Sequence, residues 1–402
     1  MKLFAVIALL LLISYSGIAQ PKTDWSVALV ESTMKRHPTA KDLGSWEYAR
    51  SLYLYGQYLV YKRTHEPRYL KYIKDWVDLH VDDQGVVRSA NEQGEVREVK
   101  FDNLDSMLPG NLLLLLYQET KAEKYKLAAD RIRRSFDKYP RTQDDGFWHA
   151  AGLESQLWAD GAFMSLPFLV RYGSMFGDSK YANDEAVLQL LVYSNHLSDL
   201  RTGLMFHAYD ESGKSAWASK ETKLSAERWC RAMGWFGMTL IEVLELLPRD
   251  HPMRPILVGQ VFLLVKAWAR YQDEKTGLWY QVVDKGDGAR NWLETSSSSM
   301  FTYVTAMAVD RSYVEPKYAN GVKRGYAGVL TKISLDKDGQ TNLTDICEGT
   351  GVADLAYYFA RKRNTNDFHG LGAFLIMNEK FMNETLKGSS KSLWQPTSIK
   401  KP

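Results

Sequence analysis

The chain has 402 residues, of which 45% are apolar and 25% are charged, a composition typical of an ordinary globular protein. The formal net charge is only +3, so a surface that binds nucleic acid or another polyanion is not expected. Aromatic residues make up 12% of the chain, and flat aromatic faces suit both core packing and stacking on sugar rings.

Residues 1–20 predict an export signal. Lys2 supplies a positive charge, residues 3–13 are apolar, and small residues precede a plausible cleavage site near Gln20. No other stretch approaches the roughly eighteen apolar residues of a membrane span, so we expect no membrane insertion. We therefore expect an exported protein that works in a bacterial periplasm.

Cysteine usage excludes a fold that depends on a disulfide framework. Only Cys230 and Cys347 are present, and a single bridge between them is left open. The chain has neither a zinc-like cysteine spacing nor an HExxH motif, so we expect no bound metal.

A repeated unit organises the chain. Glycine-containing turns recur at intervals of 57 to 74 residues, at Gly85, Gly146, Gly203, Gly277 and Gly339. Each interval holds one apolar helical stretch and one amphipathic stretch. In the amphipathic stretch EKYKLAADRIRRSFDKY, one face carries Tyr125, Ala128, Ala129, Ile132 and Phe136. The period predicts helical hairpins with an apolar inner helix and an amphipathic outer helix.

The hairpins predict an all-α fold, an (α/α)6 barrel in which six hairpins close into a toroid. The segments WSVALVESTMKR at 25–36 and FHGLGAFLIMNEKFM at 368–382 supply the outer and inner helices of the closing pair. We expect one catalytic domain over residues 21–386, a polar tail over 387–402, and strands only in short hairpins near the glycine turns.

Polar and aromatic residues at the starts of the inner helices are the candidate site, because corresponding positions of successive hairpins converge on one rim of a barrel. They are Trp46, Asp102, Asp105, Trp158, Asp160, Trp229, Arg231, Trp235 and Ser296 to Ser299, together with His207, Tyr209 and Asp210 after the third glycine turn.

Asp160 is the sharpest catalytic candidate. It lies between Trp158 and a long apolar helix, and such surroundings are expected to raise the pKa of a carboxyl group. Asp105 holds the equivalent place one repeat earlier, and the alternative for either residue is a helix N-cap. Two carboxyl groups that face one cavity are what acid and base chemistry on a sugar requires.

The remaining candidates are predicted substrate contacts. The tryptophans suit stacking on a sugar, although each alone is equally explained as core. A buried Arg231 needs an anion, either a substrate carboxylate or a structural acid, and His207 is either a ligand or a satisfied turn residue. The serine run, with Ser296 and Ser298, predicts either a linker or a helix start that receives an anion.

Six segments carry a resemblance to a known family: LDSMLPGNLLLLLYQET, FWHAAGLESQLWADGAFMSLPFLVRYG, GLMFHAYDE, RWCRAMGWFGMTLIEVLELLP, ETSSSSMFTYV and ICEGTGVAD. In this order they resemble glycoside hydrolase family 105, the unsaturated rhamnogalacturonyl hydrolases, which are related to the unsaturated glucuronyl hydrolases of family 88. The chain departs from many members at Ala232 and Met233, where Gly-Asn is usual, and at Glu348, where Gln is common.

The resemblance implies an (α/α)6 barrel that removes a 4,5-unsaturated galacturonyl or glucuronyl residue from lyase-generated oligosaccharides, without a cofactor. It places the catalytic Asp at Asp160 and the second carboxylate at Asp105, with His207, Trp229 and Arg231 as further site residues. The partner is then a small unsaturated oligosaccharide, and the protein is expected to be a monomer or a weak homodimer.

Three alternatives stay open at this point. A conventional inverting glycosidase would use the same two carboxylates on a saturated glycoside. A sugar epimerase would need a pair of cavity histidines, for which only His207 is a good candidate, since His37, His65 and His251 are predicted at helix ends or in loops. A noncatalytic sugar binder would keep the tryptophans without needing Asp160.

Overall fold

The structure is a computed structural model and describes residues 23–91, 93–286, 288 and 290–385. The predicted export signal at 1–20 and the predicted tail at 387–402 lie outside the described residues.

Helices dominate the described chain. The α-helices are α1 (Trp25–Arg36), α2 (Tyr48–Thr64), α3 (Pro67–His80), α4 (Gly110–Thr120), α5 (Glu123–Ser135), α6 (Ala159–Phe176), α7 (Ser179–Leu197), α8 (Cys230–Leu246), α9 (Arg254–Tyr271), α10 (Thr295–Asp310), α11 (Ala319–Leu330), α12 (Leu355–Phe359) and α13 (Phe368–Thr385). The 3-10 helices are η1 (Ala40–Leu43), η2 (Leu104–Ser106), η3 (Phe136–Lys138), η4 (Val283–Lys285) and η5 (Pro316–Tyr318).

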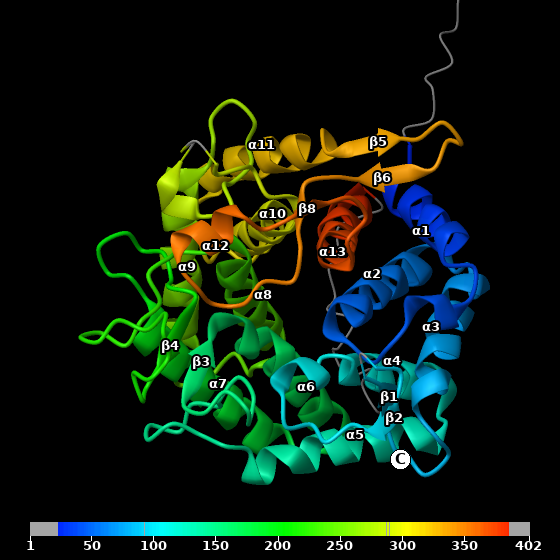
Figure 1. Cartoon of the computed structure of the whole chain (residues 1–402). Helices are drawn as coiled ribbons and strands as arrows, with labels where there is room; N and C mark the ends of the chain where they lie inside the picture. Colours follow the sequence, from blue (N-terminus) through cyan, green and yellow to red (C-terminus); the bar gives the residue numbers. More distant parts are fainter. Residues whose placement is uncertain (1–22, 92, 287, 289, 386–402) are drawn as a thin grey trace, which may run out of the picture.

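The long helices form two concentric layers (Figure 1). In the inner layer α2, α4, α6, α8, α10 and α13 pack side by side in this order, and α13 packs back against α2 to close the ring. The outer layer is formed by α3, α5, α7, α9, α11 and α1, each against its own inner helix. The predicted (α/α)6 toroid is confirmed.

Inner and outer helices differ as their sequences predict. The inner helix α4 buries every residue from Leu112 to Leu116, because neighbouring inner helices and the outer helix α5 surround it. The outer helix α5 buries only one face, at Tyr125, Ala128, Ala129 and Ile132. The apolar run from Leu112 to Leu116 therefore lies in a helix of the inner layer.

The glycine turns follow the outer helices, and Gly85 and Gly277 each pack on the outer helix of the next hairpin. Gly277 has a φ of +75°, and a Cβ there would lie 2.3 Å from the backbone oxygen of Arg324 in α11. Gly85 has a φ of +70°, and its Cβ would lie 2.5 Å from Cβ of Leu127 in α5. Both the left-handed backbone and the close approach exclude a side chain, which explains why the signal recurs with the repeat.

The ring closes through the two ends of the described chain, as predicted. Helices α1 and α13 lie side by side, and Nδ2 of Asn378 in α13 donates a hydrogen bond of 2.7 Å to Oγ of Ser26 in α1. The guanidinium of Arg63 in α2 pairs with Glu379 in α13 at 2.7 Å.

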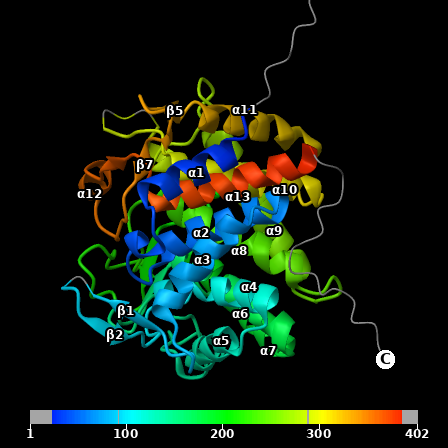
Figure 2. The ribbon, with the colours of Figure 1, turned by 90° about the vertical axis from the view of Figure 1, so that its right-hand side faces the viewer.

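Short strands cluster at one end of the toroid, where β1, β2, β7 and α12 lie beyond the same ends of the helices (Figure 2). The strands are β1 (Arg88–Ala90), β2 (Val96–Glu98), β3 (Gln156–Trp158), β4 (Ala208–Asp210), β5 (Ile333–Leu335), β6 (Thr341–Leu343), β7 (Ile346–Cys347) and β8 (Arg363–Asn364). They form four antiparallel pairs, β1 with β2, β3 with β4, β5 with β6 and β7 with β8. Within the described residues, no helix combines the length and apolar character needed to cross a membrane.

Candidate active site

The pairing of β3 with β4 brings Asp160 and His207 together from adjacent hairpins. Trp158 pairs with Ala208, so the start of α6 faces the residue that precedes β4. Oδ2 of Asp160 lies 3.1 Å from Nε2 of His207, and neither atom has another hydrogen-bond partner among the described residues. Asp160 occupies the first helical turn and Trp158 the N-cap position, so Asp160 is not the N-cap of α6.

The sequence-based expectation of a raised pKa for Asp160 is wrong in the substrate-free protein. Burial raises the pKa of this carboxyl group, but the neighbouring His207, His149 and Arg231 side chains lower it by a larger amount. The net pKa lies below the ordinary aspartate value, so the group is ionised at neutral pH.

Asp105 reaches the same region from the preceding hairpin. It lies in η2, which packs against α6, and its Oδ1 is 3.5 Å from Nε2 of His149. The carboxyl group retains partial solvent exposure, whereas His149 is buried. Burial lowers the pKa of His149, but Asp105 and Asp160 raise it more strongly, so the net pKa is above the ordinary histidine value.

His149 was missed in the sequence, although a signal was present. An isolated bridge follows each of the second and third glycine turns, at Phe147 and at Met205. His149 and His207 each lie two residues beyond that bridge, so they hold equivalent positions in successive hairpins. Aligning the segments after Gly146 and Gly203 by their strand register would have found the pair.

This histidine pair corrects one argument made from the sequence. The chain was expected to offer only His207 as a cavity histidine and therefore to lack what an epimerase needs. The structure instead places His149 and His207 on either side of Trp158, which stacks on His149 at 4.5 Å and meets His207 edge-on at 5.7 Å. The histidine count therefore does not exclude an epimerase.

The four candidate tryptophans hold different positions. Trp158 keeps partial solvent exposure, whereas Trp46, Trp229 and Trp235 are buried. Trp46 stacks on Trp76, and its Nε1 donates to the backbone oxygen of Ser106, next to Asp105. Trp46 thus supports the segment that carries a candidate carboxylate.

Trp229 and Trp235 flank the site from the start of α8. Trp229 lies 4.7 Å from the ring of His207, and its Nε1 has no hydrogen-bond partner among the described residues. Trp235 stacks on Phe163 at 4.9 Å and meets Tyr48 edge-on.

Arg231 is buried beneath the site, with its guanidinium 4.6 Å from the ring centroid of Trp229. It donates hydrogen bonds of 2.6 Å to the backbone oxygens of Cys347 and Glu348, and Glu294 lies 3.9 Å away. A structural acid is therefore close to this arginine, which is one of the two partners that the sequence left open.

The serine run begins α10, and the anion at its start belongs to the protein. The carboxylate of Glu294 accepts hydrogen bonds from the backbone amides of Ser296 and Ser297. Ser296 and Ser298 are fully buried, and Oγ of Ser298 accepts a hydrogen bond from the amide of Trp279. The serine run is therefore the start of a helix and not a linker. The carboxylate of Glu294 occupies the place at this helix start where an anion was expected.

Tyr48 is a second residue that the sequence analysis missed. It is the first residue of α2, is partly exposed, and its hydroxyl lies 2.7 Å from Nε2 of His369. Nδ1 of His369 lies 2.6 Å from Oδ1 of Asp367. His369 and Asp367 lie at the start of α13, which packs against α2 to close the ring. The contact between His369 and Tyr48 therefore joins segments that are far apart in the sequence.

The segment between β7 and β8 covers the other side of His207. Tyr358 of α12 is buried, and its hydroxyl lies 2.7 Å from Nδ1 of His207. Burial raises the pKa of Tyr358 far above the ordinary tyrosine value, so the phenol stays neutral. His207 is thus held between Tyr358 and Asp160.

Two further features bear on which chemistry the site supports. Among the described residues, no group of three or more His, Cys, Asp or Glu side chains is arranged to hold a metal ion. Cys230 and Cys347 are buried free thiols, so the bridge that the sequence left open is not formed.

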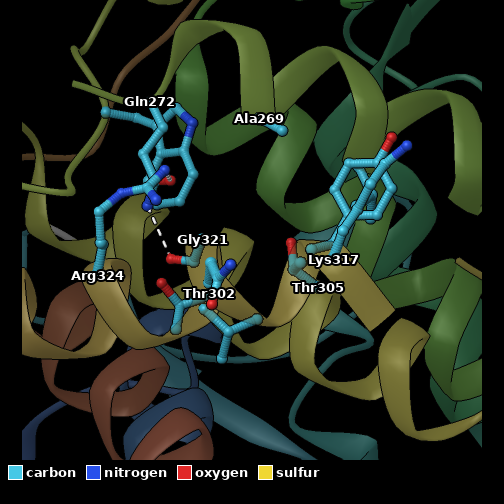
Figure 3. A pocket seen from close by; sticks show the side chains of 12 residues that line it. Ala269, Gln272, Thr302, Thr305, Lys317, Gly321 and Arg324 are labelled. Carbon is cyan, nitrogen blue, oxygen red and sulfur yellow. Dashed lines mark hydrogen bonds between the residues drawn. The ribbon is translucent and has the colours of Figure 1, made fainter. Parts of the chain in front are cut away.

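A separate pocket of about 340 Å³ lies between α9, α10 and α11 (Figure 3). Its lining includes Ala269, Gln272, Thr302, Thr305, Lys317 and Arg324. None of the candidate site residues lines it, so it is distinct from the carboxylate site.

The fold and the site together indicate the class of protein. A toroid of helical hairpins with two carboxylates, each beside a histidine and grouped around a partly exposed tryptophan, has the features of an enzyme that acts on carbohydrate. The chain belongs to Glycosyl Hydrolase Family 88, whose family model matches residues 25–383.

Individual relatives support the same family assignment. A glycoside hydrolase of family 105 from C. acetobutylicum ATCC 824 superposes with a TM-score of 0.84 at 32% identity, over 90% of this chain and 100% of that one. The unsaturated rhamnogalacturonyl hydrolase YesR of Bacillus subtilis is 26% identical over 77% of this chain and 81% of its own length. An unsaturated glucuronyl hydrolase from Bacillus sp. GL1 shares the fold, with a TM-score of 0.67 at 12% identity, over 93% of this chain and 98% of that one. The resemblance to family 105 predicted from the sequence is confirmed, and the protein is a glycoside hydrolase.

Proposed function

We propose that this hydrolase removes a 4,5-unsaturated uronic acid from the non-reducing end of a short oligosaccharide, with Asp160 as the proton donor. The observation that carries the proposal is the pair of carboxylate–histidine contacts, Asp160 with His207 and Asp105 with His149, on either side of Trp158. The names of the family 105 and rhamnogalacturonyl relatives support the substrate class.

The unsaturated sugar contains a vinyl ether, C4=C5–O, whose carbon C4 accepts a proton. Asp160 donates this proton, and positive charge then develops at C5 and the ring oxygen. Water adds to C5, and the resulting hemiketal opens and releases the remaining saccharide. Because this is hydration rather than displacement at the anomeric carbon, no covalent glycosyl intermediate is needed.

Asp105 has a supporting role in this reaction. Its partly exposed carboxylate orients water or ring hydroxyls, and its negative charge stabilises the cation that forms at C5. Trp158 provides an aromatic face for the sugar ring. The other residues predicted as substrate contacts are all buried, so their proposed role is to shape the site: Trp46, Trp229, Trp235, His207, Arg231, Ser296 and Ser298.

A proton donor must first hold a proton, and Asp160 is ionised in the substrate-free protein. Substrate binding shifts the balance of these influences toward a higher pKa. The sugar excludes water, which adds to the effect of burial, and the substrate carboxylate brings a negative charge that disfavours a second anion. Both changes raise the pKa of Asp160 at the moment at which the acid is required.

The test is a turnover assay on a panel of lyase-generated unsaturated disaccharides, followed by loss of the ultraviolet absorbance of the double bond. Unsaturated galacturonyl-rhamnose comes first because the rhamnogalacturonyl hydrolase is a relative. We expect Asp160→Asn to lower kcat about 1,000-fold or more with the circular dichroism spectrum unchanged. The matched control is Asp184→Asn, an exposed aspartate of α7, which should retain full turnover.

The panel also separates the alternatives. Cleavage of a saturated disaccharide without an absorbance change would identify a conventional inverting glycosidase. Interconversion of a free sugar without hydrolysis would identify an epimerase, and binding without turnover would identify a sugar-binding protein. Near-normal turnover by Asp160→Asn would remove that residue from the proposed role.

We further propose that the protein acts after export to a periplasm and works as a monomer or a weak homodimer. The apolar stretch at residues 3–13 behind Lys2 supports export. Cell fractionation with a cytoplasmic marker tests the compartment, and sedimentation of the purified protein tests the assembly.

A further inference from the structure

Tyr48, His369 and Asp367 form a chain of hydrogen-bonding groups that ends at the site. The phenol oxygen of Tyr48 lies 2.7 Å from Nε2 of His369, and Nδ1 of His369 lies 2.6 Å from Oδ1 of Asp367. Nδ2 of Asn364 donates to the second carboxylate oxygen of Asp367 at 2.9 Å. The order of groups, carboxylate then imidazole then hydroxyl, is that of a catalytic relay.

The protonation states of the two ends assign a direction to this chain. Burial raises the pKa of Asp367, but His369, Asn364 and Arg231 lower it by a larger amount, so the net pKa lies well below the ordinary aspartate value. The carboxylate is therefore ionised and accepts the Nδ1 proton of His369. In the tautomer that carries its proton on Nδ1, Nε2 of His369 holds a lone pair that accepts the phenol proton of Tyr48.

Tyr48 does not become a proton acceptor by ionising to a phenolate. Burial raises the pKa of its phenol well above the ordinary value, and the negative charges of Asp105 and Asp160 add to this effect. With its own hydrogen directed to His369, the neutral phenol presents oxygen lone pairs to its other surroundings. The ring of Tyr48 meets Trp235 edge-on at 6.4 Å, and Trp235 stacks on Phe163, three residues after Asp160, so Tyr48 lies beside the start of α6.

We propose that Tyr48, backed by His369 and Asp367, accepts the proton of the water that adds to the substrate. The inference rests on the proposed hydration reaction and identifies the base that it requires. Tyr48 is the residue that contacts water, and His369 and Asp367 are positioning residues that act through it.

The proton balance closes without a further reactant. Asp160 gives its proton to C4, the water oxygen forms a bond to C5, and one water proton moves to the phenol oxygen of Tyr48. The phenol proton moves at the same time to Nε2 of His369, and Asp367 stabilises the imidazolium that results. After the product leaves, His369 gives its extra proton to solvent, and Asp160 takes up a proton from solvent when the next substrate binds.

The first experiment measures the relay without substrate. In proton and nitrogen-15 NMR spectra of the full chain, we expect a downfield Nδ1 proton on His369 that exchanges slowly. Asp367→Asn should abolish it, and Tyr48→Phe should retain it with a shifted frequency. Absence of this proton from the unsubstituted protein would overturn the relay whatever the substrate is.

The second experiment measures turnover of the unsaturated disaccharide. We expect Tyr48→Phe and Asp367→Asn each to lower kcat about 100-fold while KM changes less than about threefold, and the double variant to lose no more than Tyr48→Phe alone. Charged groups that face the relay, Asp105, Asp160 and Arg231, remain in all these variants.

The matched control is Tyr58→Phe, which removes another α2 phenol that hydrogen-bonds a carboxylate, that of Glu119, away from the site. It should keep full kcat. If Tyr48→Phe behaves like this control while the NMR signal is present, the relay has no part in water addition. If the unsubstituted protein hydrates no unsaturated disaccharide, the proposed function fails first and takes the role of the relay with it.

Discussion

The inner ring holds two groups of buried polar residues that are used in opposite ways. Along the ring interior, Arg171 of α6 donates to Asn111 of α4 at 2.6 Å and to Tyr55 of α2 at 3.1 Å, and it pairs with Glu242 of α8. At the start of the same helix α6, about 16 Å away at 1.5 Å per residue, Oδ2 of Asp160 has no hydrogen-bond partner among the described residues.

The difference separates charged groups that join helices from charged groups that meet at the helix starts. The interior group ties four inner helices together through hydrogen bonds and an ion pair among its members. At the helix starts, Oδ2 of Asp160 and Nε2 of His207 meet only each other, at 3.1 Å, and Nδ1 of His149 has no hydrogen-bond partner in the described part of the chain. A polar ligand that approached the helix starts could hydrogen-bond to these groups, so we expect a substrate there.

The largest expected effect is on stability and comes from the interior group. Glu242→Gln leaves the guanidinium of Arg171 buried without its charge partner, so we expect the free energy of unfolding to fall by about 3 to 5 kcal/mol. The kcat of the folded enzyme should change less than twofold. Urea denaturation and the disaccharide assay measure the two quantities.

A matched control for that substitution is Glu245→Gln, which breaks the more exposed pair with Arg311. It should cost about 1 kcal/mol or less. Loss of turnover by Glu242→Gln at unchanged stability would show that the interior group is part of the catalytic machinery.

The next effect is on catalysis, at Asp105. Asp105→Asn removes the charge that faces His149 and the developing cation, so we expect kcat/KM to fall about 100-fold with the fold intact. Asp102→Asn, at an exposed carboxylate three residues earlier, is the control and should stay within about twofold. Unchanged kinetics in Asp105→Asn would remove this residue from the site.

A smaller effect is expected at Tyr358, which holds His207 from behind. Tyr358→Phe removes one hydrogen bond to Nδ1 of His207, so we expect a loss of about tenfold in kcat, equivalent to about 1.4 kcal/mol. Tyr172→Phe, which removes a phenol bonded to Asp130 outside the site, should leave kcat unchanged. Equal kinetics for the two variants would mean that Tyr358 does not position His207.

The smallest effect is a pH dependence of stability through His149. Because its pKa is higher in the folded than in the unfolded protein, the stabilisation is fully present below the ordinary value of about 6.5 and is lost as the pH rises through the raised value. Measuring the free energy of unfolding across that range should show this loss in the unsubstituted protein. The dependence should be weaker in Asp105→Asn, and an identical profile in both proteins would contradict the proposed pairing.

Local patterns made much of the fold predictable. The apolar stretches form the inner helices and the amphipathic stretches form the outer helices. The glycine turns lie between hairpins, where Gly85 and Gly277 pack tightly on the next outer helix. Asp160 and Asp105 were found because both stand at the starts of apolar segments, where side chains of successive hairpins converge.

The sequence was less informative about how the site residues are used. Trp46 was chosen at the start of α2, but Tyr48, two residues later, makes the contact with His369. The serine run was linked to a substrate anion, yet Glu294 fills that position. The pKa of Asp160 was expected to be raised, because its apolar neighbours in sequence gave no indication of the histidines that approach it in space.

The sequence by itself therefore determined the repeat, the layers of the toroid, the family and the two carboxylates, because these depend on periodicity and on short continuous segments. Only the tertiary structure decided which histidine meets which carboxylate, because those contacts join residues of different segments through strand pairing and ring closure. Charge balance in a buried site depends on such contacts, since removing water makes each neighbouring charge count more strongly.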